Sequence, residues 1–259
     1  GPVLLALFLQ AMYGAVDLIV VGKFAGTADI SAVSTGSQAM QLVTSLLVGL
    51  TTGVTVLLGQ KIGEGKPDEA GSVIGSAICL FVCVALGLTA GLVTLAAPFC
   101  RLLQAPEEAF DPTTQYVRIC SAGTLFIVAF NVIGSVFRGL GDSKMPLITV
   151  AIACVVNIFG DLLLVAGFGM DAAGAAIATV FAQAVSFLFA VVILLKKELP
   201  FSVASEDVRI NPQCGKFLGI GLPLALQEFL TQLSFLTLCA FVNRLGLTAS
   251  SGYGLPARS

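Results

Sequence analysis

Long apolar runs separated by short polar segments dominate the chain. Seven of them approach or exceed the roughly 20 residues that an α-helix needs to cross ~30 Å of hydrocarbon. We predict spans at residues 2–21, 30–59, 70–98, 113–137, 146–166, 172–195 and 217–242, with a candidate eighth after residue 247. Glycines also recur four residues apart within the runs, as at Gly49 and Gly53, a spacing that lets membrane helices pack closely. The pattern predicts an all-α, polytopic membrane protein.

One polar segment is longer than the others and divides the chain. It covers residues 196–214, contains two prolines and follows six predicted spans. We therefore predict a six-helix transmembrane bundle at residues 1–197, a cytoplasmic linker at 198–213, and the truncated start of a second helical unit at 214–259. Composition alone fits an ordinary loop equally well.

Basic residues are distributed unevenly between the alternating loops. Eight fall in one set of loops, namely Lys61, Lys66, Arg138, Lys144, Lys196, Lys197, Arg209 and Lys216. Four fall in the other set, namely Lys23, Arg101, Arg118 and Arg244. The positive-inside rule places the richer set, and with it the N-terminus, in the cytoplasm. No basic region with a cleavage site precedes the first run, so we expect a multi-pass protein of the inner or plasma membrane without a cleaved signal peptide.

The composition excludes several classes of function. Hydrophobic residues make up 57% of the chain and charged residues 11%, whereas a soluble domain is about a quarter charged. Histidine is absent, no basic tract suits nucleic acid, and no phosphate-binding loop is present. The seven cysteines contain no CxxC pair. We expect neither an enzyme nor a cofactor beyond a coupling ion.

Ionisable residues inside the predicted spans carry the functional information. Asp17 lies in the first span, Asp161 in the fifth and Glu228 in the seventh, and Asn157 precedes Asp161 by one helical turn. No Lys or Arg lies in the middle of the first six spans to neutralise them. Buried carboxyl groups of this kind mark ion paths in membrane proteins. They would bind Na⁺ through oxygen ligands or share a proton. The alternative is a structural carboxylic acid bonded to a neighbouring helix.

Several amide side chains are weaker candidates for a substrate cavity. With Glu228, which also fits a position near a helix end, the candidates are Gln38, Gln41, Asn131 and Gln183. For each amide, a hydrogen bond between helices is an equally simple interpretation.

Three stretches of the chain resemble the multidrug and toxic compound extrusion (MATE) family. They are Met12 to Asp17 with Val21 to Gly26, Phe137 to Pro146, and Asn157 to Asp161 with Gly174 to Thr179; Gly221 to Pro223 is a softer match. The resemblance implies part of a twelve-helix protein with two six-helix lobes, monomeric when full length. It implies a cation site at Asp17, Asn157, Asp161 and Thr179 and a helix-bending role for Pro2.

The same resemblance implies a function. Members of the family export cationic or amphipathic small molecules against an inward flow of Na⁺ or H⁺. Some branches carry an acidic residue in the seventh helix where this chain has Thr231, so a second Na⁺ site is not expected here. Two alternatives stay open: a flippase for lipid-linked precursors from the same superfamily, which a basic cavity would favour, and an inactive truncated membrane fragment or structural assembly unit.

Overall fold

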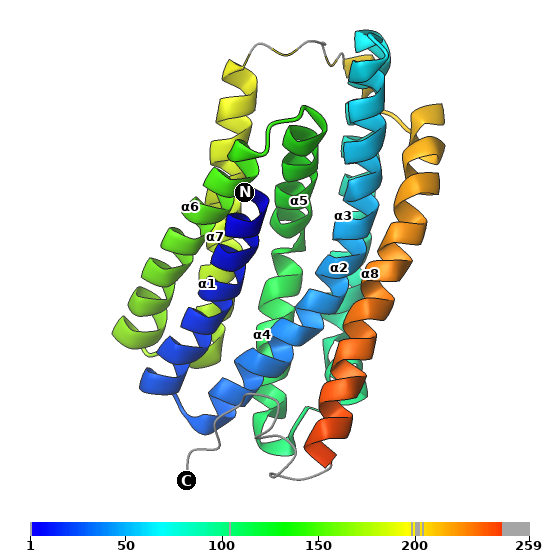
Figure 1. Cartoon of the computed structure of the whole chain (residues 1–259). Coiled ribbons are helices and arrows are strands. Elements are labelled where there is room, and N and C mark those ends of the chain that lie inside the picture. Colours follow the sequence, from blue (N-terminus) through cyan, green and yellow to red (C-terminus); the bar gives the residue numbers. More distant parts are fainter. Residues whose placement is uncertain (1, 104, 198, 200–202, 204, 245–259) are drawn as a thin grey trace.

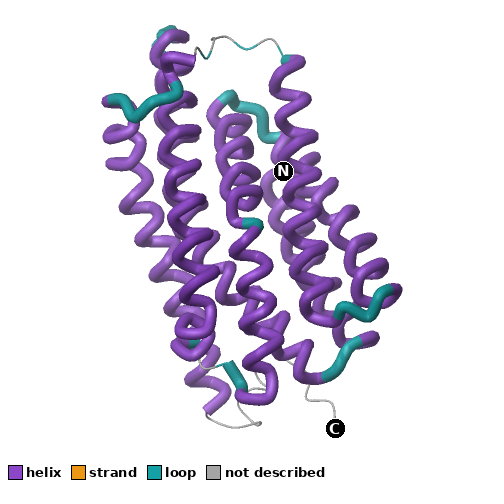
Figure 2. The backbone as a smooth tube through the Cα atoms, turned by 180° about the vertical axis from the view of Figure 1, so that it is seen from behind, coloured by secondary structure: helices purple, strands orange, loops and turns teal. Residues whose placement is uncertain are grey.

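The computed structural model describes residues 2–103, 105–197, 199, 203 and 205–244, and throughout these ranges the regular structure is helical (Figures 1 and 2). The helices are α1 (Pro2–Phe24), α2 (Thr27–Gly63), α3 (Pro67–Leu102), α4 (Phe110–Ala122), α5 (Thr124–Gly139), α6 (Lys144–Asp161), α7 (Asp171–Lys196) and α8 (Pro212–Arg244). Two 3-10 turns, η1 (Glu107–Ala109) and η3 (Ser205–Asp207), and a π-helical segment, η2 (Leu162–Gly167), complete the described elements. The all-α class predicted from the apolar runs is confirmed.

Most of the predicted spans correspond to single helices, each a few residues longer than its apolar run. Five helical stretches of the described chain are long and apolar enough to cross a membrane, or six if the bent pair α4–α5 forms one span. The helices extend past the apolar runs because polar residues such as Gln60 and Lys61 continue the last turns at the membrane edge. The chain is therefore a multi-pass membrane protein.

The fourth predicted span is broken rather than continuous. Instead of one helix over residues 113–137, α4 and α5 meet at Gly123 and are bent by 54°. A Cβ atom at Gly123 would overlap the side chain of Val180 in α7. Glycine therefore allows the bend to sit directly against α7, and glycine is a common site of helix kinks.

The seventh predicted span corresponds to α8, and this helix contacts the bundle although the sequence places it in a second helical unit. Among the described elements, α8 packs along α2 and α3, and Figure 1 shows it beside α2. It is not among the helices that qualify as membrane spans, and Gln227, Glu228 and Gln232 interrupt its apolar sequence. The division at residues 198–213 stays a prediction, and the candidate eighth helix after residue 247 lies outside the described residues.

The core and the outer surface of the bundle are both apolar. One buried cluster joins α1, α2, α4 and α7 around Val21 and Val33, and a second joins α2, α3, α5 and α8 around Leu58 and Phe81. Large apolar side chains such as Phe159 also point outward. An apolar exterior around helices with internally bonded backbones suits a hydrocarbon environment.

The loops separate into two ends of the bundle. The α2–α3 turn, the α5–α6 loop, the end of α7 and residues 205–211 lie at the upper end in Figure 1, hereafter the linker-side end. All eight basic residues of the richer set lie in or beside these segments. The structure thus gathers them at one end, while the side of the membrane that this end faces stays a prediction.

An ion pair ties the α5–α6 loop to the end of α7. Lys197 Nζ lies 2.7 Å from Asp142 Oδ2, while Asp142 Oδ1 accepts hydrogen bonds from the backbone N–H groups of Lys144 and Met145 at 3.1 and 3.2 Å. The hydrogen bond from Lys197 is the main cause that holds the pKa of Asp142 below its ordinary value of 3.8.

Asp142→Asn is expected to keep both backbone bonds and lose the ion pair, which lowers the free energy of unfolding by about 0.5–1 kcal/mol at pH 7. Because the folded-state pKa is depressed, this stabilisation is present in full above the ordinary pKa and is lost as the pH falls through the lower folded value. Thermal midpoints at pH 7 and pH 3 check this. Asp142→Ala, which also loses the backbone bonds, should stay destabilised at both values. An equal deficit for Asp142→Asn at both pH values would contradict the prediction.

Candidate cation-binding site

Four polar side chains meet where α1, α6 and α7 pack together. Asp17, Asn157 and Asp161 are 5%, 1% and 0% exposed, and Thr179 of α7 is partly buried beside them. The carboxyl group of Asp17 lies close to the side chains of Asp161, Asn157 and Thr179. The structure therefore brings together, from three helices, the residues that the sequence singled out.

A glycine contact sets the spacing between α6 and α7 at this site. A Cβ atom at Gly160 would lie only 2.8 Å from the Cβ atom of Ala178, so the two helices approach as closely as a hydrogen atom at this position permits. Asn157 Nδ2 consequently reaches Thr179 Oγ1 at 3.4 Å. Asn157 and Asp161 share a face of α6 because they are one helical turn apart.

The cluster contains many hydrogen-bond acceptors and few donors. Within the described chain, Asp17 Oδ1, Asn157 Oδ1 and both carboxyl oxygens of Asp161 accept no hydrogen bond, although all are buried. None of the ion pairs of the described residues reaches Asp17 or Asp161. A buried charge without a partner is costly. A cation bound between the two carboxyl groups would satisfy several of these oxygens, and a shared proton would satisfy two of them.

The chemistry of the donors limits which ion fits. Two carboxyl groups, an amide oxygen and a hydroxyl oxygen are hard ligands, which suit Na⁺ or a proton. No group of three or more His, Cys, Asp or Glu side chains that could hold a metal occurs among the described residues. The donor set therefore fits a monovalent coupling ion better than a transition metal.

The helix changes its geometry immediately after the site. Asp161 is the last residue of α6, and the chain continues as the π-helical segment η2, which packs against α1 and α7. Gly174 of α7 lies against η2, where an added Cβ atom would come within 3.2 Å of the backbone of Leu164. Short π-helical segments often occur at functional sites. Here η2 sets the direction in which the chain continues after Asp161.

Two tyrosines that the sequence interpretation missed extend the cluster. Tyr13, one turn before Asp17 in α1, lies close to Gln183 of α7. Tyr116 of α4 reaches Thr179, and its ring lies where a Cβ atom at Gly36 of α2 would be. The spacing of four residues between Tyr13 and Asp17 was a usable signal. Nothing local to Tyr116 indicates its contact with α7.

The other predicted site residues lie elsewhere. Gln38 and Gln41 are exposed on α2, and Glu228 is exposed on α8. Asn131 donates a hydrogen bond to the carbonyl oxygen of Ile127 in its own helix at 2.8 Å. Pro2 is the first residue of α1, and its side chain lies outside those that the structure describes. Of the predicted cavity residues, only Gln183 therefore lies beside the cluster formed by Asp17, Asn157, Asp161 and Thr179.

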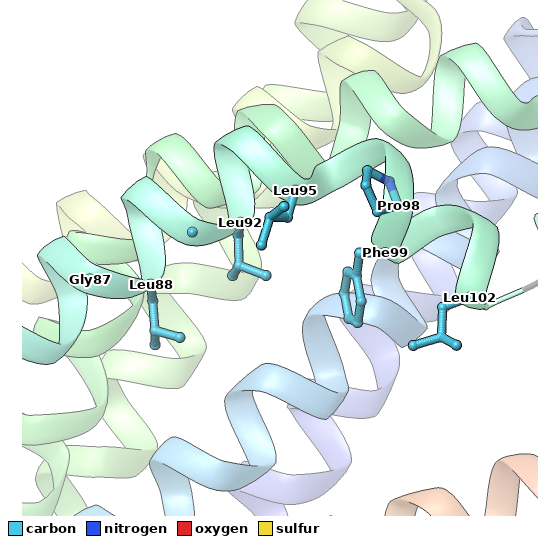
Figure 3. Close-up of a pocket in the computed structure, with 8 residues that line it drawn as sticks. Gly87, Leu88, Leu92, Leu95, Pro98, Phe99 and Leu102 are labelled. Carbon is cyan, nitrogen blue, oxygen red and sulfur yellow. The ribbon is translucent and has the colours of Figure 1, made fainter.

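An apolar groove of about 380 Å³ lies on α3 and is shown in Figure 3. Its lining consists of Gly87, Leu88, Gly91, Leu92, Leu95, Pro98, Phe99 and Leu102. None of these side chains carries a charge or a hydrogen-bonding group, so the groove suits hydrocarbon and offers no counter-charge to an ion.

The family of the chain follows from its first 163 residues. The family model MatE matches residues 2–163, which is more than half of the chain. The chain belongs to the MatE family. Curated proteins similar to this MatE chain include "Probable multidrug resistance protein YpnP" from Bacillus subtilis, 29% identical over 99% of the chain and 58% of the relative. "Multidrug export protein MepA" from Staphylococcus aureus is 26% identical over 99% of the chain and 57% of the relative.

Not every relative is named for drug export. A "FAD transporter" from Shewanella oneidensis is 26% identical over 90% of the chain and 53% of its own length. The MatE chain thus spans a little over half the length of these relatives. Among solved structures, an "Outward-facing conformation of a multidrug resistance MATE family transporter" has a TM-score of 0.83 at 24% identity, covering 94% of the chain and 53% of that structure. The inward-facing conformation has a TM-score of 0.81 over 88% of the chain and 52% of that structure. These likenesses show the fold.

Proposed function

We propose that the protein containing this chain is a secondary active antiporter that exports organic cations, drugs or other xenobiotics in exchange for Na⁺ or H⁺. The observation that carries the proposal is the buried pair of carboxyl groups, Asp17 and Asp161, of which Asp17 Oδ1 and both oxygens of Asp161 lack a hydrogen-bond donor. The multidrug names of the curated relatives support the substrate class.

The coupling follows from charge neutralisation. A cation or proton shared between Asp17 and Asp161 neutralises one of the two buried charges and lies between both carboxyl groups, with Asn157 and Thr179 supplying neutral oxygens. An ion shifts a conformational equilibrium only by its different affinity for the two states. If α1 and α6 separate in one state, the ion binds the other more tightly, and an ion gradient then drives the change.

The charge distribution favours a cationic substrate over an anionic one. Among the described residues, Lys61 is the only basic side chain in the buried class, and it is paired with Glu64 and Glu69 at 3.1 and 2.7 Å at the linker-side end. Anions such as FAD or lipid pyrophosphates require basic partners. We place the substrate between this lobe and the second one, with Gln38, Gln41, Asn131, Gln183 and Glu228 as candidate contacts.

The antiport proposal is tested with the full-length protein in proteoliposomes. Efflux of a fluorescent organic cation is measured under an imposed Na⁺ gradient, an imposed H⁺ gradient, or neither. Accumulation against the substrate gradient under one of the two ion gradients supports the proposal. Equal, passive movement under all three conditions contradicts it.

We also propose that the linker-side end and the N-terminus face the cytoplasm of a bacterial-type inner or plasma membrane, in a protein that is monomeric when complete. In a background without native cysteines, Lys144→Cys at the linker-side end should resist a membrane-impermeant maleimide in intact cells. Lys23→Cys, exposed at the opposite end, is the matched control and should be labelled. The reverse pattern would overturn this orientation.

A further inference from the structure

The apolar groove in Figure 3 lies on the half of α3 away from the linker-side end. It follows the helix from Gly87 to Leu102, where α3 ends, a length of about 22 Å at 1.5 Å per residue. Among the five described helical stretches of membrane length, α3 contains the most apolar one, and only 11% of it is buried, the smallest share of the five. The groove thus lies on a helix that the rest of the described chain leaves largely uncovered.

Glycine and proline shape the groove. Gly87 and Gly91 share a face of α3, and an added Cβ atom at either position would meet nothing within 4 Å. Pro98 lies inside the helix, where proline lacks the N–H group of a helical hydrogen bond and bends the chain. Figure 3 shows Leu92 and Phe99 projecting to the same side of α3. A floor without side chains therefore runs beside walls of large apolar groups.

The dimensions of the groove suit a single hydrocarbon chain. A volume of about 380 Å³ along about 22 Å corresponds to a cross-section of roughly 17 Å². An α-helix is about 10–12 Å wide, or roughly 80 Å² or more in section, so a helix of the second lobe cannot enter the groove. Carbon atoms in contact lie about 4 Å apart, so an extended acyl chain needs only roughly 13 Å². The length also exceeds the ~15 Å that one leaflet contributes to the hydrocarbon core.

A cationic side chain lies at the end of the groove that reaches the membrane edge. Arg101 is exposed in the last turn of α3, next to Leu102, and its guanidinium carbon lies 5.6 Å from the centroid of the Phe110 ring. None of the ion pairs of the described residues involves Arg101. A guanidinium group binds phosphate oxygens through paired N–H donors. The charge at this end complements the phosphate of a lipid whose chain lies in the groove.

We propose that the groove on α3 binds one phospholipid, with an acyl chain along Gly87 and Gly91 and the phosphate at Arg101. The lipid belongs to the leaflet on the side opposite the linker-side end. The proposal depends on the fold and on this groove, and it stands or falls separately from the ion-coupled transport proposed above.

Photo-crosslinking of the full-length protein in phosphatidylcholine vesicles tests the site. Phosphatidylglycerol with a diazirine in one acyl chain is added as a minor component, and cross-linked residues are mapped by mass spectrometry. Labelling of residues 87–102 should exceed, by at least about threefold, labelling around Leu188, which is 57% exposed on α7. Equal labelling of both surfaces would show boundary lipid only, and labelling of α7 without the groove would show that the second lobe covers it. Either result overturns the proposal.

Two substitutions test the acyl chain and the phosphate separately. Gly91→Leu fills the groove and should lower its labelling at least about threefold, whereas Gly63→Leu, at another glycine with nothing within 4 Å, should not. Arg101→Gln changes an exposed side chain and should lower labelling by phosphatidylglycerol severalfold. Labelling by a diazirine diacylglycerol, which lacks the phosphate, should be the same in Arg101→Gln and the wild type. Undiminished phosphatidylglycerol labelling in either Gly91→Leu or Arg101→Gln would overturn the proposal.

Discussion

Asp17→Asn is expected to abolish ion-coupled efflux by the full-length protein while leaving it folded. Asparagine has nearly the same shape as aspartate, but it cannot carry the charge that a cation or proton neutralises. Removing one of two buried, unpaired carboxyl groups also removes a source of instability, so the thermal midpoint should stay the same or rise. Efflux of a fluorescent cation under an ion gradient should drop to the level of empty vesicles, a loss of at least about tenfold.

The matched control for Asp17→Asn is Asp68→Asn, an exposed position near the start of α3. It makes the same chemical change at the bundle surface and should leave efflux unaltered. Unchanged efflux in Asp17→Asn would remove Asp17 from the coupling mechanism. A much lower thermal midpoint, together with unchanged transport by the protein that stays folded, would show that Asp17 stabilises the fold instead.

Gly160→Ala is expected to damage both the fold and the coupling. The added methyl group would meet Ala178, whose Cβ atom lies 2.8 Å from the ideal position, so α6 and α7 must move apart. Overpacking of this kind typically costs about 1–3 kcal/mol. The shift also draws Asn157 away from Thr179, which should weaken ion-coupled efflux at least severalfold.

A second substitution in the contacting helix should compensate for Gly160→Ala. Ala178→Gly removes the methyl group that the new side chain strikes, so the double variant should regain most of the efflux and thermal midpoint. Gly87→Ala, at a helical glycine with nothing within 4 Å, controls for the substitution itself. A double variant as damaged as Gly160→Ala would show that the contact with Ala178 does not set the site.

The positions of the helices were predictable because apolar runs of membrane length are a strong local signal. The break at Gly123 was not predictable, since glycine also occurs within unbroken membrane helices and only the contact with Val180 distinguishes this one. The docking of α8 was missed for the same reason. Its glycine partners lie about 170 residues earlier in the chain, and a small residue does not reveal which helix approaches it.

The residues of the site likewise divide into those that the sequence reveals and those that only the packing of the helices reveals. Asp17 and Asp161 stand out in sequence because a charge inside an apolar run is rare and costly. Tyr116 does not stand out, because tyrosine is common at many positions of membrane helices and its contacts with Thr179 and Gly36 depend on the packing of α2, α4 and α7. The exposed amides gave no information on a cavity that a second lobe would have to complete.

The central claim is that Asp17 and Asp161 hold one coupling ion together. Equilibrium binding of radioactive Na⁺ and uptake of protons, measured on the same purified full-length protein, tests it most directly in the wild type, Asp17→Asn, Asp161→Asn and the double variant. Shared ligation predicts that one of the two signals is lost in either single variant and that the double variant loses nothing more. Retention of both Na⁺ binding and proton uptake in Asp17→Asn, or two independent partial losses that add in the double variant, would contradict it.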